Sequence, residues 1–212
     1  MTGGKKRTML LALGGVLALV GGAAAFWQLT APKAVLLVGD CITFGYAEPL
    51  RAKLGPGYAV WHDEHPTGTI CNLLSHVEER VISQKADIIV LNVGLHDVTR
   101  KGEVIGPRCT PKEYRQGVAG LLALLRKHTR ARLIWATCTP CVDRITHDFR
   151  SNADIDIINA ISRDEAQKAG VEVVDLNALL RGSVEELTRD GTHYKPAGYK
   201  MMAMAIADTI LP

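Results

Sequence analysis

Residues able to carry out acyl transfer occur in two distant segments of the chain. Cys41 directly follows a candidate supporting residue, Asp40, and much later Asp190 and His193 lie three residues apart. A cysteine thiol can attack a carbonyl carbon, and an imidazole can remove the proton of that thiol. A carboxylate three residues before a histidine can hold the imidazole in one tautomer. These residue types predict nucleophilic catalysis with an oriented base, provided that the fold brings the two segments together.

Two further segments contain groups that can stabilise a negatively charged oxygen. Gly68 lies in one, and Gly94, His96 and Asp97 lie in the other, which reads Gly-Leu-His-Asp. The backbone N–H groups of Cys41 and Gly68 and a ring N–H of His96 can donate hydrogen bonds to an oxyanion. One such donor in a preorganised site is worth about 2.7–4 kcal/mol. Groups of this kind form an oxyanion hole where a fold brings them together, and Gly94 and Asp97 lie beside them as candidate supporting residues.

Alternating strand and helix patterns indicate how these segments meet. Continuous apolar runs predict buried strands, a weaker run predicts an edge strand, and apolar residues at helical spacing predict helices. The predicted strands are residues 34–38, 58–62, 87–92, 133–136 and 171–174, and the predicted helices are residues 69–83, 111–128, 152–169 and 196–210. Such alternation produces a parallel sheet with helices on both faces, and ligands bind beyond the carboxyl ends of its strands. The candidate residues fall at strand ends or in neighbouring loops, so we expect them to converge.

Taken in chain order, these motifs resemble the SGNH (GDSL-type) hydrolase family over residues 33–212. The family has Gly-Asp-Ser after its first strand, a glycine in its second block, Gly-x-Asn-Asp after its third strand and Asp-x-x-His near its end. The resemblance implies a flavodoxin-like, three-layer α/β/α fold and a five-stranded parallel sheet of order 2-1-3-4-5. It also implies hydrolysis of ester or related acyl bonds.

Carried over residue by residue, the resemblance makes Cys41 the nucleophile, His193 the base and Asp190 the group that orients the base. Gly68 and His96 fall on two positions of the oxyanion hole. Two residues depart from the family's pattern, because Cys41 stands where the family has serine and His96 where it has asparagine. A helix N-terminus after the first strand is expected to favour the Cys41 thiolate, which is a better nucleophile at neutral pH than an alkoxide.

These departures leave three functions open. The chain can be a Cys-dependent acyl-ester hydrolase of the esterase or deacetylase type, an acyltransferase acting on envelope polysaccharide, or an inactive binding protein that keeps the fold. The presence of both Asp190 and His193 favours catalysis, because a binding protein has no chemical need for the pair. We expect the hydrolase, with a small acyl ester or an O-acetylated glycan as its substrate and no cofactor.

The N-terminal segment predicts export. Three basic residues at positions 5–7 precede an uncharged run, of which the most apolar part, residues 9–27, would form roughly 28 Å of helix. That length suits a membrane anchor, whereas the small residues near its end suit cleavage of a signal peptide. Under either interpretation of residues 1–32, residues 33–212 lie outside the cytoplasm, in the periplasm or at the cell surface.

The chain has five cysteines, and an oxidising compartment permits disulfides between them. We expect Cys109 to pair with Cys138 or Cys141, preferably Cys141, because the loops after neighbouring strands leave from the same edge of a sheet. The Cys138-x-x-Cys141 spacing also occurs in thiol–disulfide oxidoreductases, which remain an alternative. A zinc site is not expected, because the sequence offers no second pair of ligands at a suitable spacing.

The charge balance argues against a nucleic-acid partner. The 212 residues include 25 Lys and Arg against 22 Asp and Glu, and the excess of three lies at positions 5–7. The rest of the chain is balanced, whereas nucleic-acid binding needs a concentrated basic surface. The length suits one domain with one core. We expect a monomer that binds neither nucleic acid nor a metal ion.

Overall fold

The computed structural model describes residues 31–101, 108–143 and 148–211. The predicted anchor or signal peptide lies outside the described residues, apart from Ala31 and Pro32, and stays a prediction. No helix in the described ranges is both long enough and apolar enough to cross a membrane.

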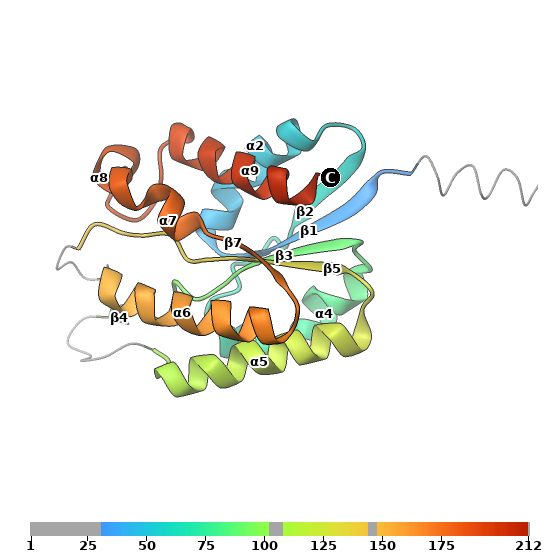
Figure 1. Cartoon of the computed structure of the whole chain (residues 1–212), viewed down its shortest axis with the longest axis horizontal. Coiled ribbons are helices and arrows are strands. Elements are labelled where there is room, and N and C mark those ends of the chain that lie inside the picture. Colours follow the sequence, from blue (N-terminus) through green and yellow to red (C-terminus); the bar gives the residue numbers. More distant parts are fainter. Residues whose placement is uncertain (1–30, 102–107, 144–147, 212) are drawn as a thin grey trace, which may run out of the picture. The chain divides into compact units, whose positions relative to one another are not determined.

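Five parallel strands form the central sheet (Figure 1). They are β1 (Lys33–Gly39), β2 (Tyr58–His62), β3 (Ile88–Asn92), β5 (Arg132–Ala136) and β7 (Glu172–Val174). Their order across the sheet is β2-β1-β3-β5-β7, which confirms the expected order 2-1-3-4-5. The carboxyl ends of β1 and β3 are therefore neighbours at one edge of the sheet.

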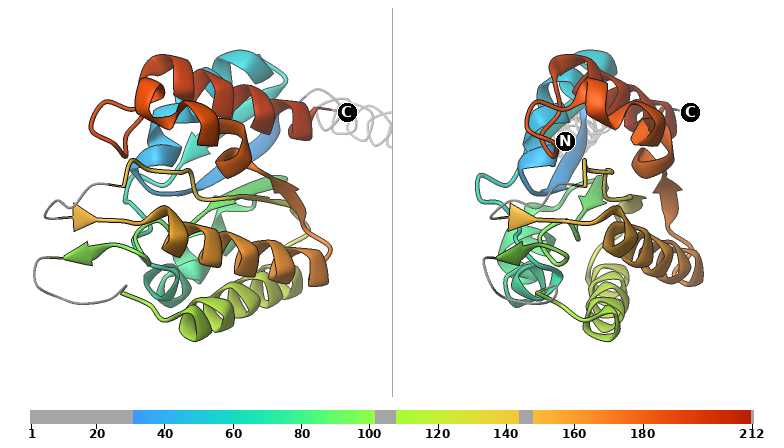
Figure 2. Two further views of the ribbon diagram at one scale, coloured as in Figure 1. Left: turned by 60° about the vertical axis from the view of Figure 1, so that its left-hand side comes forward. Right: turned by 90° about the vertical axis from the view of Figure 1, so that its left-hand side faces the viewer.

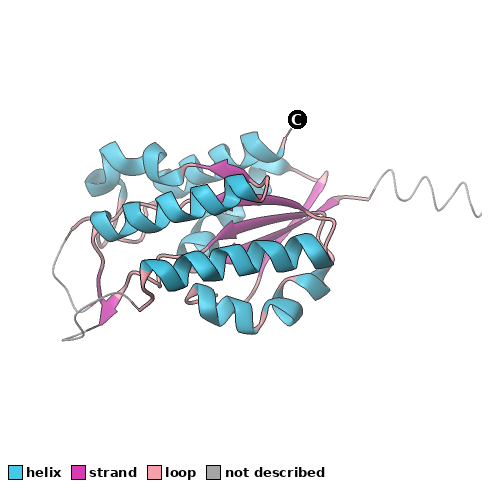
Figure 3. Cartoon of the chain, turned by 60° about the horizontal axis from the view of Figure 1, so that its bottom comes forward, coloured by secondary structure: helices cyan, strands magenta, loops and turns pink. Residues whose placement is uncertain are grey.

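Helices cover both faces of this sheet (Figures 1 and 2), which confirms the three-layer α/β/α arrangement. Over one face, α2 (Cys41–Leu54) packs against α9 (Pro196–Ile210). Over the other face, α5 (Pro111–His128) packs against α6 (Asn152–Lys168), and these helices stand in front of the sheet in Figure 3. The shorter helices are α3 (Ile70–Ser75), α4 (Val77–Arg80), α7 (Leu176–Leu180) and α8 (Val184–Leu187), with 3-10 turns η1 (Ile82–Gln84) and η2 (Arg181–Ser183).

The apolar runs of the central strands match their burial. Every residue of β3 is buried, β1 is buried after its first two residues, and β5 is buried after its first residue. A strand covered by helices on both faces meets no water on either side, so its sequence shows no polar alternation. In the edge strand β2, by contrast, only Val60 is fully buried. The sheet thus holds the ends of β1 and β3 rigidly, and the candidate residues follow those ends.

The prediction of one continuous helix over residues 69–83 is wrong. The chain forms α3, α4 and η1 instead, with a first break at His76, where φ is −124° and ψ is 11°. The Ser75 hydroxyl donates to the Cys71 carbonyl at 3.1 Å, and the His76 ring donates to the Asn72 carbonyl at 2.9 Å. Side chains that bond to carbonyls four residues earlier compete with the backbone and bend helices.

A two-stranded antiparallel sheet also lies beyond the carboxyl ends of β3 and β5 (Figure 2). It pairs β4 (Arg100–Lys101) with β6 (Asp148–Phe149). The Arg100 guanidinium bonds to the Asp154 carboxylate of α6 at 2.7 Å, which ties this small sheet to the layer of α5 and α6. Strands of two residues have no periodicity, so the sequence did not predict them.

Candidate active site

Cys41 is the first residue of α2 and follows β1 after a single turn residue. That turn residue, Asp40, caps the helix by accepting a hydrogen bond from the Ile42 N–H at 3.0 Å. Gly39 is needed for the close approach of the helix, because a Cβ there would lie 1.9 Å from the Thr43 hydroxyl oxygen. The Gly-Asp-Cys motif therefore presents the thiol at the carboxyl edge of the sheet.

His193 reaches Cys41 from a distant part of the chain. Its Nε2 atom lies 3.1 Å from Cys41 Sγ, and its Nδ1 atom lies 2.7 Å from Asp190 Oδ2. Because an ionised carboxylate only accepts hydrogen bonds, Nδ1 carries a proton and Nε2 accepts from the thiol. The three side chains form one hydrogen-bonded chain, and their roles as nucleophile, base and orienting carboxylate stay a prediction.

Asp190 is held as a carboxylate by its own loop. Its Oδ1 atom accepts the backbone N–H groups of Thr192 at 2.9 Å and His193 at 2.7 Å. Partial burial acts to raise the pKa of Asp190, but these hydrogen bonds and the one from the His193 ring lower it to about 2. The carboxylate that orients the imidazole is therefore charged over the whole physiological pH range.

The surroundings of Cys41 favour the neutral thiol. Burial, followed by the charge of Asp40, raises the pKa of Cys41 to about 11, and the N–H groups at the start of α2 oppose this only partly. Asp40 is itself buried, and burial raises the pKa of its carboxyl while the nearby His96 acts to lower it. The helix N-terminus does favour the thiolate, as expected, but burial and the charge of Asp40 outweigh its effect on the pKa of Cys41.

The loop that carries Gly68 is fastened to both neighbouring strand ends. The Thr67 N–H donates to the Gly39 carbonyl at 3.0 Å, which joins this loop to the end of β1. The Ile70 N–H lies 3.0 and 3.1 Å from the two carboxylate oxygens of Asp97, in the loop after β3. Gly68 has φ of +65°, a left-handed conformation that favours glycine. Gly68 is thus held beside the β1 end from which Cys41 follows.

His96 lies on the Asp40 side of the same edge. Its Nε2 atom is 3.9 Å from Asp40 Oδ2, and its side chain is 27% exposed. Gly94, with φ of +139°, starts the loop, and a Cβ there would lie 2.6 Å from the Tyr114 hydroxyl oxygen. The structure therefore brings both oxyanion-hole candidates and the supporting residues Asp40, Gly94 and Asp97 to the strand ends around Cys41.

A positive charge that sequence reasoning did not single out also belongs to this region. Arg150 follows β6, and its Nε–H donates to the Leu95 carbonyl at 3.1 Å, directly before His96. Burial raises the pKa values of Cys41 and Asp40, and the Arg150 charge acts against both shifts. No motif marks Arg150, since its position depends on how the segment after β5 folds back.

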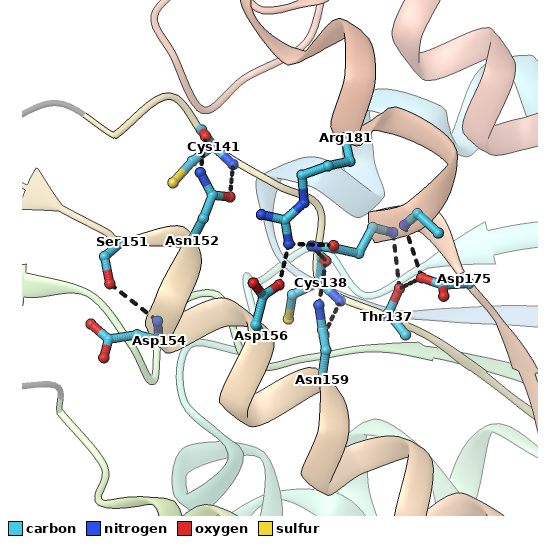
Figure 4. Close-up of polar contacts among 12 residues, drawn as sticks. Thr137, Cys138, Cys141, Ser151, Asn152, Asp154, Asp156, Asn159, Asp175 and Arg181 are labelled. Carbon is cyan, nitrogen blue, oxygen red and sulfur yellow. Dashed lines mark hydrogen bonds and ion pairs between the residues drawn. The ribbon is translucent and has the colours of Figure 1, made fainter.

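Two asparagines of α6 hold the loop that follows β5 (Figure 4). The Cys141 N–H donates to Asn152 Oδ1 at 3.2 Å, and Asn152 Nδ2 donates to the Cys141 carbonyl at 2.6 Å. Asn159 makes the same pair of bonds with Cys138, at 2.8 and 2.9 Å. Each amide side chain satisfies the N–H and the carbonyl of one loop residue, so residues 138–141 are fixed in place.

This loop in turn supports the segment that carries His193. The Val142 N–H donates to the Gly191 carbonyl at 2.8 Å. The buried Tyr194 hydroxyl donates to the Pro140 carbonyl at 2.7 Å. Both bonds lie within two residues of His193 in the sequence. Sequence reasoning missed these contacts, because they join residues about 50 positions apart without a recognisable spacing.

The cysteines do not form the expected disulfide. All five are free thiols, so the predicted bridge from Cys109 to Cys141 or Cys138 is wrong. The amides of Asn159 and Asn152 fix Cys138 and Cys141 to α6, whereas Cys109 lies directly before Thr110, the N-cap of α5, so different segments hold the cysteines in place. Their contacts are different: the Cys109 N–H bonds to the Asp97 carbonyl, Cys138 Sγ lies against the Val93 carbonyl, and Cys141 Sγ lies against the Arg150 carbonyl. Within the described ranges, no three His, Cys, Asp or Glu side chains are grouped to hold a metal ion.

Comparison with known proteins points to one family. The sequence model of the GDSL-like lipase/acylhydrolase family matches residues 37–201. An acetylxylan esterase from Xylanibacter ruminicola is 25% identical over 220 residues, a match that covers 86% of this chain. The chain spans only 45% of the length of that relative.

Solved structures share the fold. An acetyl xylan esterase, AlAXEase, superposes with a TM-score of 0.72 at 22% identity, covering 84% of this chain and 100% of its own. An acetylxylan esterase from Geobacillus stearothermophilus gives a TM-score of 0.70 at 19% identity, covering 86% of this chain and 97% of its own. The family match places the Cys41 and His193 segments within one recognised domain type.

Proposed function

Because the chain belongs to the GDSL-like lipase/acylhydrolase family, a family of ester-bond hydrolases, we propose that it is an extracytoplasmic acyl esterase with Cys41 as its nucleophile. The observation that carries this proposal is the hydrogen-bonded chain from Cys41 through His193 to Asp190, with lengths of 3.1 and 2.7 Å. A nucleophile, a base and an orienting carboxylate at these distances have the geometry that acyl transfer requires.

In the first half of the reaction, Cys41 Sγ attacks the ester carbonyl carbon as His193 Nε2 takes the thiol proton. The carbonyl oxygen becomes an oxyanion, which accepts hydrogen bonds from the N–H groups of Cys41 and Gly68 and from the ring of His96. The tetrahedral intermediate collapses by breaking the bond to the alcohol oxygen, and His193 returns its proton to that oxygen. The alcohol leaves, and a thioester remains on Cys41.

In the second half, water replaces the alcohol. His193 Nε2 removes a proton from the water as its oxygen attacks the thioester carbon. Collapse of the second tetrahedral intermediate breaks the carbon–sulfur bond, and the proton on His193 goes to the sulfur. The products are a carboxylic acid and the free Cys41 thiol, so the site returns to its starting state.

We infer that the substrate is an acetyl ester on a glycan. The two acetylxylan esterases among the solved structures and the esterase from Xylanibacter ruminicola support this choice. A series of p-nitrophenyl esters from acetate to palmitate, followed by acetate release from acetylated xylan, tests it. We expect rates to fall as the acyl chain lengthens. Faster hydrolysis of palmitate than of acetate would show that the natural substrate is a lipid ester.

The proposed location rests on the basic residues at positions 5–7 and the apolar run at 9–27. Expression of the whole chain in bacteria, followed by protease treatment of spheroplasts, tests it. Digestion of the domain from outside intact spheroplasts is the expected result, and protection would contradict it. We further expect a monomer, since the proposed catalytic residues all come from one chain, and light scattering measures this.

The decisive experiment is intact-protein mass spectrometry after mixing with p-nitrophenyl acetate. Wild type is expected to carry one acetyl group, and Cys41→Ala none. An adduct that persists in Cys41→Ala and maps to Ser75 or Ser151 would identify another nucleophile. Added alcohols or sugars distinguish the alternatives: acetyl transfer to them in excess of hydrolysis indicates an acyltransferase, and absence of any adduct indicates a binding protein.

A further inference from the structure

An open cleft of about 660 Å³ lies along the edge strand β2, outside the hydrogen-bonded chain of Cys41, His193 and Asp190. One wall is formed by β2 and the loop after it, from Trp61 to Pro66. The opposite wall is formed by the helical segments α3, α4 and η1, and Leu36 of β1 contributes to the floor. Ligand-binding clefts in proteins typically measure about 300–1,000 Å³. The cleft is therefore large enough for an organic ligand.

Its main apolar surface is the indole of Trp61. Trp61 and Leu36 are partners in the β1–β2 register, so their side chains lie on the same face of the sheet. Trp61 is half-buried, and in the described part of the chain no acceptor takes its indole N–H. A flat ring with a negative face and a free polar edge suits a sugar ring, which offers C–H groups on one face and hydroxyls at its rim.

The opposite wall is polar and suited to hydroxyl groups. Asn72, His76 and Glu79 all line the cleft from the α3–α4 segment. An amide, an imidazole and a carboxylate offer both donors and acceptors. Gln84 extends the same wall with a second amide. Ligands rich in hydroxyl groups both donate and accept hydrogen bonds, so they match these side chains.

The charges in the cleft select against acidic ligands. Arg80 is the only Lys or Arg among its lining residues, and its guanidinium is already paired with the Asp63 carboxylate and bonded to the His65 carbonyl. Two further lining carboxylates, Glu64 and Glu79, have no Lys or Arg partner among the described residues. An anionic sugar or a phosphate would meet these carboxylates without a free cation to balance its charge.

The cleft adjoins the proposed oxyanion hole through a shared wall. Asn72 Nδ2 donates to the Thr67 carbonyl at 2.7 Å, and it lies 3.4 Å from the point where a Cβ of Gly68 would be. His62 also lines the cleft, and its ring lies 4.6 Å from the ring of Phe44, in the first turn of the helix that starts at Cys41. A sugar chain lying in the cleft would thus run toward Gly68 and Cys41.

From these observations we infer that the β2 cleft is a binding subsite for a neutral oligosaccharide, stacked on Trp61, whose esterified unit reaches Cys41. The inference rests on the proposed esterase function and adds to it the place where the glycan is held. The ester bond itself is broken at Cys41, and the cleft contributes only to binding of the sugar.

The test compares two substrates on Trp61→Ala, Trp61→Phe and a control, Tyr58→Ala, which removes an aromatic ring from the same strand outside the cleft. Trp61→Ala is expected to raise the KM for acetylated xylo-oligosaccharides by about tenfold or more, because the sugar loses one main binding contact. The kcat/KM for p-nitrophenyl acetate should change less than about twofold, because this ester is too small to reach the cleft. Trp61→Phe keeps a flat ring and should recover most of the affinity, and Tyr58→Ala should leave the KM unchanged.

Direct binding of xylohexaose, measured by titration calorimetry, separates this inference from the proposed function. Binding by wild type that is weakened at least about tenfold in Trp61→Ala supports the cleft, even if no ester is hydrolysed. Hydrolysis of p-nitrophenyl acetate without Trp61-dependent sugar binding would overturn the inference and leave the esterase intact. Equal losses on both substrates in Trp61→Ala, or tighter binding of trigalacturonate than of xylohexaose, would also overturn it.

Discussion

At the scale of single residues, the proposed nucleophile Cys41 is a neutral thiol, just as a serine nucleophile is a neutral hydroxyl. With a pKa of about 11, only about one Cys41 in 10⁴ is a thiolate at pH 7. In the proposed mechanism, the hydrogen bond from the thiol to His193 Nε2 would then transfer the proton during attack, rather than before substrate binds. We therefore expect general-base catalysis by His193 on a neutral thiol, rather than a preformed thiolate–imidazolium pair.

Alkylation of Cys41 should accordingly be slow at neutral pH. We expect the rate of reaction with iodoacetamide to rise about tenfold per pH unit from pH 7 to 10, because only the thiolate reacts. Asp40→Asn should make the reaction faster at each pH, since it removes a negative charge that raises the pKa of Cys41 and keeps the cap to Ile42. Peptide mass spectrometry follows the modification, with the exposed Cys71 as internal reference. A rate that is already at its plateau at pH 7 would contradict the neutral thiol.

Asp97 should make the free energy of unfolding depend on pH. Burial raises its pKa to about 6, against 3.8 for an ordinary aspartate, so the folded chain binds this proton more tightly than the unfolded chain. The bound proton of Asp97 adds about 3 kcal/mol to the free energy of unfolding below about pH 4. This contribution is lost as pH rises through 6. Asp97→Asn removes this titration, so the variant should gain stability relative to wild type from pH 4 to 6.

Urea denaturation of both proteins at pH 4.5, 5.5 and 7 measures that difference. Asp208→Asn, an exposed position on α9, is the control and should follow wild type at every pH. A difference between Asp97→Asn and wild type that stays constant over this range would show that Asp97 does not titrate there.

At the scale of elements, two loops in contact with each other position His193, the proposed base. Helix α6 fixes the loop after β5 through Asn152 and Asn159, and this loop fixes the His193 segment through Pro140 and Val142. The separation of Nε2 from Sγ therefore depends on contacts that lie several residues from the reacting atoms. Misplacement of a catalytic group by about 1 Å can cost about 100-fold in rate.

Tyr194→Phe tests this positioning of His193 by deleting one buried hydroxyl. The Pro140 carbonyl loses its donor, so we expect a loss of about 1–3 kcal/mol in the free energy of unfolding. We also expect kcat toward p-nitrophenyl acetate to fall by about 10- to 100-fold with KM nearly unchanged. Tyr46→Phe deletes a comparable buried hydroxyl, which bonds to Thr43, and should lose stability alone. Equal kcat values in the two variants would show that Tyr194 has no positioning role.

Some elements were predictable and others were not, for identifiable reasons. The start of α5 has the sequence of a capping box, and Thr110 and Glu113 indeed bond to each other's backbone N–H groups. The break at His76 was missed because it depends on side-chain bonds to carbonyls, which leave the apolar spacing of residues 69–83 unchanged. The strands β4 and β6 were missed because two residues carry no pattern.

At the scale of the whole molecule, topology explains why the convergence of these segments could be predicted. In a parallel sheet the strand ends meet at one edge, so the residues that follow β1 and β3 had to be neighbours. Electrostatics could not be predicted in the same way. The raised pKa of Cys41 and the charge of Arg150 both depend on which distant segments cover the site, and no local spacing encodes that.

A chain that begins at Ala31 should fold and act as the full chain does. The first backbone bonds of the sheet start at Lys33, whose N–H donates to the Gly57 carbonyl, and the family match begins at residue 37. We expect its melting temperature to lie within about 2 °C of that of the full chain, and kcat/KM toward p-nitrophenyl acetate to agree within about twofold. Circular dichroism and steady-state kinetics measure this. An aggregated or inactive product would mean that residues 1–30 contribute to the fold.

The pairing of α2 with α9 has a consequence for biosynthesis (Figure 1). Cys41 and His193 are 152 positions apart, so the ribosome makes the nucleophile long before it makes the base. Until α9 has been made, the apolar face of α2 that packs against it stays exposed, and chaperones can bind that face. A nascent or prematurely terminated chain carries Cys41 without His193, its proposed base. If the proposed mechanism holds, esterase activity is expected only after the segment from Asp190 to Ile210 has been translated and has docked, so an unfinished chain should not hydrolyse esters.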